Sequence, residues 1–260
     1  MMIKQIDYQI SDADWEQYFL QTPKQFIEMQ KLLLKQRKQH LNHLDKLLYY
    51  FAFHCSPFYS QKCIETIQTI YRARIYWAEN DSEPVKAKDN PFQGYNKVDS
   101  FIPPVKLVSE GRVNKKNIVY LYAASKLETA LAEVEPCLSN DVSVAEIKIN
   151  QLVHLFNMAL WNIGIDSGNH VRDNWVDRVI LDLAECFYSI NTKKEDYHIC
   201  QYIGQFVKSL GFDGIQYYSS KNRSNLDGNA GINYAIFNYE KCEPKSSILV
   251  HVLDVHYDYI

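Results

Sequence analysis

The residues with the clearest chemistry lie in one stretch near the middle of the chain. Gly111 to Asn114 (GRVN) form a cationic turn, Val119 to Ala123 (VYLYA) form a short apolar strand, and a helix is predicted from Ser125 onward with Glu133 near its end. This order places an arginine, a tyrosine and a glutamate within one strand–helix unit. Such side chains suit a ligand with phosphates, an aromatic base and a labile sugar bond, which favours a dinucleotide.

The elements on either side of this stretch are predicted from periodicity. Ile70 to Trp77 alternates large apolar and basic residues, and Val142 to Ile149 alternates in the same way, so both are predicted strands. The pair Pro103-Pro104 excludes a central strand there. Ser125 and Glu128 have the spacing of a capping box, which predicts the start of the helix at Ser125.

The second half of the chain mixes helices and strands without regular alternation. Helices are predicted over 174–190 and 197–210, and strands over 215–218, 232–238 and 248–255. This pattern favours an α+β fold over a doubly wound sheet. No G-x-G-x-x-G follows a strand, so a dinucleotide site here is not expected to be of the Rossmann type.

The first part of the chain reads as helix. Pro23 is a helix start signal, an apolar stripe recurs at steps of three and four residues from Phe26 to Phe51, and Ser56-Pro57 ends it. We therefore expect an α-helical N-terminal domain over 1–68 and a second domain over 69–260.

Composition excludes several classes of protein. The net charge of −3 in 260 residues argues against a general nucleic-acid binder, which needs a basic surface. Six cysteines without a CxxC pair argue against a zinc site or a disulfide framework and favour reduced thiols in a cytoplasmic protein. There is no signal-peptide core, and no apolar run approaches the ~20 residues that span a bilayer.

Five segments in order resemble the RES-domain family. They are Pro103-Pro104, Gly111–Asn114, Tyr120–Ala123, Glu128–Val134 (ETALAEV) and the late pair Gly211–Ser220 (GFDGIQYYSS) with Gly231–Phe237 (GINYAIF). The resemblance covers residues from about 70 to 240. It implies a fold similar to ADP-ribosyltransferase toxins, with two split antiparallel sheets and flanking helices clasping NAD in a cleft.

The resemblance also implies an activity and partners. Family members degrade NAD by cleaving the bond between nicotinamide and ribose, so NAD is the substrate and no further cofactor is required. Many members are toxins paired with a helix-turn-helix antitoxin, and such toxins are often homodimers. The helical N-terminus resembles the HEPN-like bundles that precede some RES domains.

The family's functional residues map onto this chain by motif. Arg112, Tyr122 and Glu133 match its arginine, tyrosine and glutamate, and Asn233 matches an asparagine that leads into the last core strand. Ser219 matches its serine, with Ser220 as a competitor because this chain has Tyr218 where the family often has proline. Arg72 matches a first-strand arginine, with Arg74 as a rival.

Each assignment has a chemical reason. Loss of nicotinamide builds positive charge on the ribose, and Glu133 would stabilise it, although Glu128 and Glu135 fit as well on sequence alone. Arg112 would hold the pyrophosphate, with Gly111 giving the backbone room to approach the ligand. Tyr120 and Tyr122 share one face of their strand, and one of them would stack on nicotinamide or bond the ribose, with core packing as the alternative. Ser219 or Ser220 would contact the nicotinamide end or orient Glu133.

Three other functions stay open at this point. A mono-ADP-ribosyltransferase would share the fold and differ in the acceptor. A ribonuclease in the N-terminal helices would use Arg37 and His43, although Lys38 departs from the HEPN pattern. A pure interaction module would keep the helical stripe as a docking face and have an inactive cleft.

Overall fold

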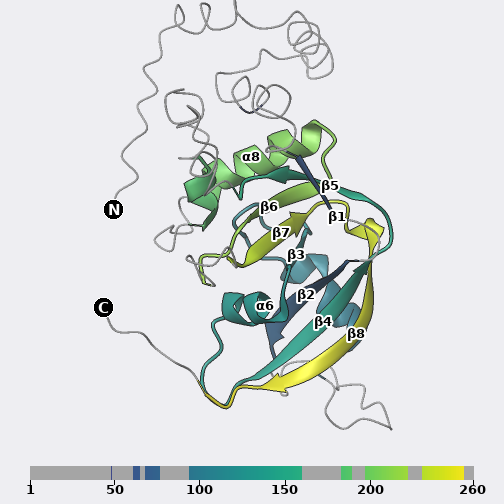
Figure 1. The fold of residues 1–260 in the computed structure, drawn as a ribbon, viewed down its shortest axis with the longest axis vertical. Coiled ribbons are helices and arrows are strands. Elements are labelled where there is room, and N and C mark those ends of the chain that lie inside the picture. Colours follow the sequence, from purple (N-terminus) through teal and green to yellow (C-terminus); the bar gives the residue numbers. More distant parts are fainter. Residues whose placement is uncertain are drawn as a thin grey trace, which may run out of the picture. The chain divides into compact units, whose positions relative to one another are not determined.

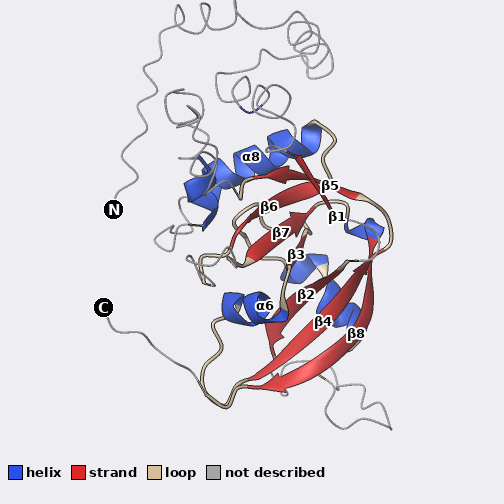
Figure 2. Ribbon diagram, viewed as in Figure 1, coloured by secondary structure: helices blue, strands red, loops and turns tan. Residues whose placement is uncertain are grey.

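The structure is a computed structural model that describes residue 48 and residues 61–64, 68–76, 94–159, 183–188, 197–221 and 230–254. Within these residues the fold is α+β, as expected, and is built on one mixed sheet (Figures 1 and 2). The strands lie in the order β1, β5, β6, β7, β3, β2, β4, β8. The β5–β6 pair is parallel, and the other described pairs are antiparallel.

The strands and helices have these bounds: β1 Gln61–Ile64, β2 Thr69–Ile75, α5 Lys97–Phe101, β3 Leu121–Ala124, α6 Leu127–Glu133, β4 Asp141–Ile149, β5 Val153–Asn157, α8 Tyr197–Ser209, β6 Gly214–Tyr218, β7 Ile232–Ile236 and β8 Cys242–His251. Short 3₁₀ turns lie at η1 (Val105–Leu107) and η4 (Tyr239–Lys241), and residues 183–188 are helical.

The sheet is weakly joined at its middle. Strands β2 and β3 share one registered pair, Tyr71 with Ala124, whereas β2 pairs with β4 over seven positions. The resemblance implied two split sheets, and the structure instead has one sheet whose halves, β1–β5–β6–β7–β3 and β2–β4–β8, meet at this seam. Residues of both strands at this seam line a cavity that is described below.

A shared apolar core ties the two halves together. Ile70 of β2, Leu121 of β3, Ile147 of β4, Leu155 of β5 and Ile236 of β7 are all fully buried in one cluster. These residues come from strands of both halves, so burial of their apolar surface stabilises the sheet across the seam.

The helices contact different parts of the sheet. α8 lies against β6, α5 lies against β8 and β4, and α6 lies against β2 and β3, on either side of the seam. The capping box predicted for α6 is wrong. Lys126 is the N-cap residue and makes no side-chain cap, while the Ser125 amide donates to the carbonyl of Ile232 in β7. This hydrogen bond ties Ser125 to β7, and the helix begins two residues later, at Leu127.

Most of the other predicted elements are found. β2, β3, β4, β6, β7 and α8 lie where periodicity placed them, and the prolines at 103 and 104 are in no strand. Strand β5 was not predicted, and the last strand runs from Cys242 to His251 rather than over 248–255. Of the helix predicted over 174–190, the structure describes only residues 183–188, and these are helical.

The predicted N-terminal helical domain lies outside the described residues apart from residues 48 and 68 and residues 61–64, which form strand β1 rather than a helix. The division of the chain at residue 68 therefore stays a prediction, although β1 already pairs with β5 at residues 61–64. Within the described part, no helix is both long and apolar enough to cross a membrane. Cys137, Cys186, Cys200 and Cys242 form no disulfide bond.

Candidate active site

The short helix α6 carries Glu133 to the seam of the sheet. Thr129 and Ala130 are its buried residues, and Glu133 is its last residue. A carboxylate at a helix C-terminus faces the negative end of the helix dipole, which disfavours it by about 0.3–1 kcal/mol at an exposed site. Side chains from elsewhere in the fold must therefore stabilise this carboxylate.

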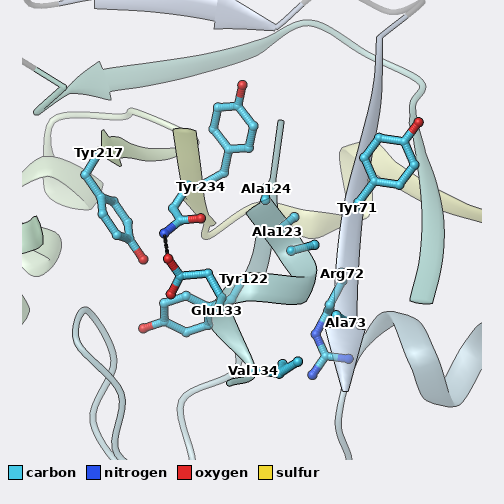
Figure 3. Close-up of a pocket in the computed structure, with 12 residues that line it drawn as sticks. Tyr71, Arg72, Ala73, Tyr122, Ala123, Ala124, Glu133, Val134, Tyr217 and Tyr234 are labelled. Carbon is cyan, nitrogen blue, oxygen red and sulfur yellow. Dashed lines mark hydrogen bonds between the residues drawn. The ribbon is translucent and has the colours of Figure 1, made fainter. Parts of the chain in front are cut away.

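Two buried side chains supply that stabilisation. Ser219 Oγ donates to Glu133 Oε1 at 2.5 Å. Asn233 Nδ2 donates to the same oxygen at 2.7 Å, which is the dashed line at Glu133 in Figure 3. Ser219 and Asn233 are 2% and 5% exposed, whereas Glu133 is exposed. No described group donates to Oε2, so one oxygen of the carboxylate is held and the other is left for a ligand.

Two adjoining cavities meet at Glu133. One, of about 250 Å³, is lined by both sides of the seam, and the other, of about 680 Å³, extends toward the 109–114 turn. Their shared lining residues are Arg72, Tyr122, Glu133 and Tyr217. We call the two together the seam cleft. Its volume is in the range of sites that hold cofactor-sized ligands.

Arg72 brings a positive charge to the seam cleft. Its Nη1 donates to the carbonyl of Ser100 at 2.5 Å, and no described acidic side chain pairs with it. Burial and then the neighbouring Arg74 lower the pKa of Arg72 to about 9, which keeps it charged at neutral pH. A desolvated cation without a carboxylate partner favours an anionic ligand. Arg74 donates to the Asp99 carbonyl and stacks on Tyr95.

Tyr122 presents its ring rather than its hydroxyl to the cleft. The hydroxyl donates to Asn114 Oδ1 at 2.7 Å and accepts from the Val113 amide at 3.0 Å. Burial raises the pKa of Tyr122 well above its ordinary value, so the phenol stays neutral. Its polar group is therefore already used within the protein, and an apolar or aromatic ligand face is what the ring can contact.

Arg112 lies along the larger cavity and is anchored from outside it. Its Nη1 donates to the carbonyls of Cys186 (3.2 Å) and Phe187, and its guanidinium lies 5.6 Å from the ring centroid of Tyr197. A guanidinium has five N–H donors. The anchored nitrogen fixes the direction of the group, and no other donor of Arg112 is hydrogen-bonded among the described residues, so these donors could bind an anion.

The turn before Arg112 is pinned by α8. Gln201 is buried and its Nε2 donates to Glu110 Oε1 at 2.9 Å and to the Gly111 carbonyl at 3.0 Å. A Cβ on Gly111 would lie 2.3 Å from Asn114 Oδ1 and 2.9 Å from the Tyr122 hydroxyl. A side chain at residue 111 would therefore disturb the Asn114–Tyr122 hydrogen bond, and Gly111 also lines the larger cavity, so its predicted role in ligand approach stays a prediction.

The structure brings together residues that are far apart in the sequence. Around the seam cleft lie Arg72, Arg112, Tyr122, Glu133, Ser220 and Asn233, with Ser219 behind Glu133. Among the rivals, Glu128 lines neither cavity, while Arg74 and Glu135 line the larger one. Glu135 forms an ion pair with Lys221.

Sequence analysis assigned no role to Tyr217, which lines both cavities. One of nineteen tyrosines, it carries no local signal. Its place follows from the register of β6 on β7, where it pairs with Asn233. Within the described residues, no group of three His, Cys, Asp or Glu side chains is arranged to hold a metal ion.

Comparison with known proteins decides the family. A family profile described as RES domain matches residues 86–258, about two thirds of the 260 residues. The chain belongs to the RES-domain family. The match contains Arg112, Tyr122, Glu133, Ser219 and Asn233, while Arg72 lies before it.

Solved structures and curated sequences add the following. The RES-domain chain is similar to a chain in the crystal structure of the M. tuberculosis MbcT–MbcA toxin–antitoxin complex, with a TM-score of 0.38 and 13% identity over 72% of this chain and 86% of the other. A comparison with curated protein sequences finds no match.

Proposed function

We propose that this RES-domain protein degrades NAD by cleaving the bond between nicotinamide and ribose. The observation that carries the proposal is Glu133. Its carboxylate lies at the unfavourable end of a helix, is fixed through one oxygen by Ser219 and Asn233, and has the other oxygen open to the cleft.

The reaction needs such a group. When the glycosidic C–N bond breaks, the electron pair leaves with neutral nicotinamide, and the ribose becomes an oxocarbenium-like cation. A fixed carboxylate beside the sugar stabilises this charge more than it stabilises the bound substrate, which lowers the barrier. In hydrolysis a water oxygen then bonds to the anomeric carbon and releases one proton to solvent. In phosphorolysis an anionic phosphate oxygen bonds to that carbon directly.

The remaining residues of the cleft suit the rest of the substrate. Arg72 and the remaining donors of Arg112 would bind the pyrophosphate, because planar guanidinium groups match phosphate oxygens. The ring of Tyr122 would contact the nicotinamide. The arrangement at the seam would then correspond to the cleft of an ADP-ribosyltransferase-like fold, in which the two halves of the sheet clasp the dinucleotide.

The direct test is to incubate the purified full chain with NAD carrying a label in its adenylate, and to follow nicotinamide by chromatography. The proposal predicts nicotinamide release and a labelled small product, either ADP-ribose or, with phosphate present, its phosphorylated form. Label on a macromolecule would instead indicate an ADP-ribosyltransferase. No release with or without phosphate would contradict the proposal.

We further propose that the enzyme acts as a toxin restrained by an antitoxin protein, as the family resemblance implies. Depletion of NAD would then stop growth. Expression of the wild-type chain is expected to lower cellular NAD and arrest growth, and Glu133→Gln is expected to do neither. Arrest without loss of NAD would contradict this role.

A further inference from the structure

Tyr217 lies at the centre of the seam cleft. It is on β6, directly opposite Asn233 of β7, and it lines both cavities although it is only 6% exposed. Its ring packs against Phe187, with the centroids 5.6 Å apart. The ring is therefore held in place by the core, and its position is set by the sheet rather than by a loop.

The hydroxyl of Tyr217 has no hydrogen-bond partner among the described residues. This differs from Tyr122, whose hydroxyl both donates and accepts within the protein. A buried hydroxyl without a partner costs about 1–3 kcal/mol of desolvation, so proteins seldom leave one unpaired. Burial, then Tyr122 and Glu133, raise the pKa of Tyr217 well above its ordinary value, so the group is a neutral O–H donor.

The hydroxyl points toward the carboxylate of Glu133 (Figure 3). No hydrogen bond joins the two groups, and Oε1 of that carboxylate is already occupied by Ser219 and Asn233. An O–H donor and an open carboxylate oxygen thus face the same space. A group that fits between them must accept from one and donate to the other, which is what a sugar hydroxyl does.

We propose that the Tyr217 hydroxyl binds the ribose that carries nicotinamide, by donating to one ribose hydroxyl that itself donates to Glu133 Oε2. The inference rests on the proposed function and adds a substrate-binding residue to it. The two tyrosines then make different contacts with the substrate. Tyr122 contacts the nicotinamide with its ring face, and the Tyr217 hydroxyl donates the hydrogen bond that holds the ribose beside the carboxylate.

The test compares two tyrosines that are neighbours on β6. Tyr217→Phe removes only the hydroxyl, and Tyr218→Phe is the matched control because Tyr218 lines neither cavity. Each variant and the wild type are assayed with NAD and with two NAD analogues that lack the 2′- or the 3′-hydroxyl of the nicotinamide ribose. Thermal unfolding of each protein is measured without ligand.

We expect Tyr217→Phe to lose about tenfold in kcat/KM with NAD, the usual effect of one neutral hydrogen bond. With the analogue that lacks the bridging hydroxyl, the loss shrinks to less than about twofold, whereas the other analogue keeps the full loss. Tyr218→Phe stays close to wild type with all three substrates. Because the hydroxyl is unpaired without ligand, Tyr217→Phe melts at the same or a higher temperature.

Two results would overturn the inference while leaving the proposed function intact. One is wild-type turnover of NAD with an equal loss for Tyr217→Phe on NAD and on both analogues, or with no loss at all. The other is melting several degrees lower for Tyr217→Phe, which would show that the hydroxyl serves the fold. No NAD turnover by the wild type would overturn both proposals together.

Discussion

Two carboxylates near opposite ends of β7 are held in contrasting ways. Asp213 is 3% exposed and accepts from Asn238 Nδ2 (2.7 Å), Lys241 Nζ (2.6 Å) and the His154 amide (2.8 Å). Glu133 accepts from Ser219 and Asn233 through one oxygen and pairs with no described cation. Asp213 is paired with a lysine and accepts hydrogen bonds on both oxygens, whereas Glu133 has one oxygen without a described donor.

The contrast separates a structural carboxylate from one suited to catalysis. Burial alone would raise the pKa of Asp213, but hydrogen bonds from Lys241, His154 and Asn238 outweigh it and lower that pKa. All of its interactions therefore stabilise the fold. The two donors to Glu133 are uncharged side chains that fix its position, and no described cation pairs with it, so a developing positive charge on a ligand could be its partner.

The largest effect is expected when the charge of Glu133 is removed. Glu133→Gln keeps an oxygen that can accept from Ser219 and Asn233, so the fold should remain while kcat for NAD cleavage falls by about 10²–10³. The matched control is Glu128→Gln on the same helix, which lines neither cavity and should keep wild-type turnover. Equal turnover rates for the two variants would contradict a special role for Glu133 in the reaction.

The next effect concerns binding rather than chemistry. Arg72→Gln removes a cation that has no acidic partner among the described residues. We therefore expect KM for NAD to rise by about 10- to 100-fold, the effect of losing a charge-assisted hydrogen bond, with kcat changed far less. Arg74→Gln should raise KM less, because Arg74 is anchored on Tyr95 and Asp99. The opposite order would assign the anion to Arg74.

A smaller effect is expected for the donors behind Glu133. Ser219→Ala removes one hydrogen bond that orients the carboxylate, and kcat should fall by about tenfold. In a Glu133→Gln background the same change should have almost no effect on turnover, because the two residues act as a unit. Ser220→Ala should reduce kcat less than Ser219→Ala, and additive losses in the double variant would argue that Ser219 acts independently.

Asp213 should show the reverse pattern, with the smallest effect on turnover. We expect Asp213→Asn to lower the free energy of unfolding by about 2 kcal/mol at pH 7, with kcat per folded molecule unchanged. Since folding lowers the pKa of Asp213, its stabilisation is present above the ordinary value of 3.8 and is lost as pH falls through the lower folded value. Denaturant unfolding between pH 7 and 2 should show a weaker pH dependence in the variant.

From the sequence, the neighbours of Glu133 could be predicted only from the order of the family motifs along the chain. The family resemblance pointed to Glu133, Ser219 and Asn233, whereas spacing along the chain could not distinguish Glu133 from Glu128. The register of the sheet places Asn233 beside the seam cleft, because Asn233 pairs with both Ala124 and Tyr217. Glu133 lies within hydrogen-bonding distance of Asn233, and Glu128 lines neither cavity. Such long-range pairing has no local signature.

The elements show the same limit. Alternation found β2 and β4, and helical periodicity found α8, because each has a long patterned run. Strand β5 has five residues, follows β4 after a short gap and is mostly buried, so it has no alternation to detect. The hydroxyl of Tyr217 could not be singled out either, since whether a tyrosine is paired depends on groups distant in the sequence.

In the proposed function, the seam cleft binds NAD with the nicotinamide ribose against Glu133. A crystal structure of the Glu133→Gln variant soaked with NAD tests it most directly, because the variant should bind the substrate without cleaving it. We expect the nicotinamide ribose between residue 133 and the Tyr217 hydroxyl, and the pyrophosphate beside Arg72 or Arg112. NAD bound away from these groups, or no NAD in the cleft under saturating conditions, would contradict the account.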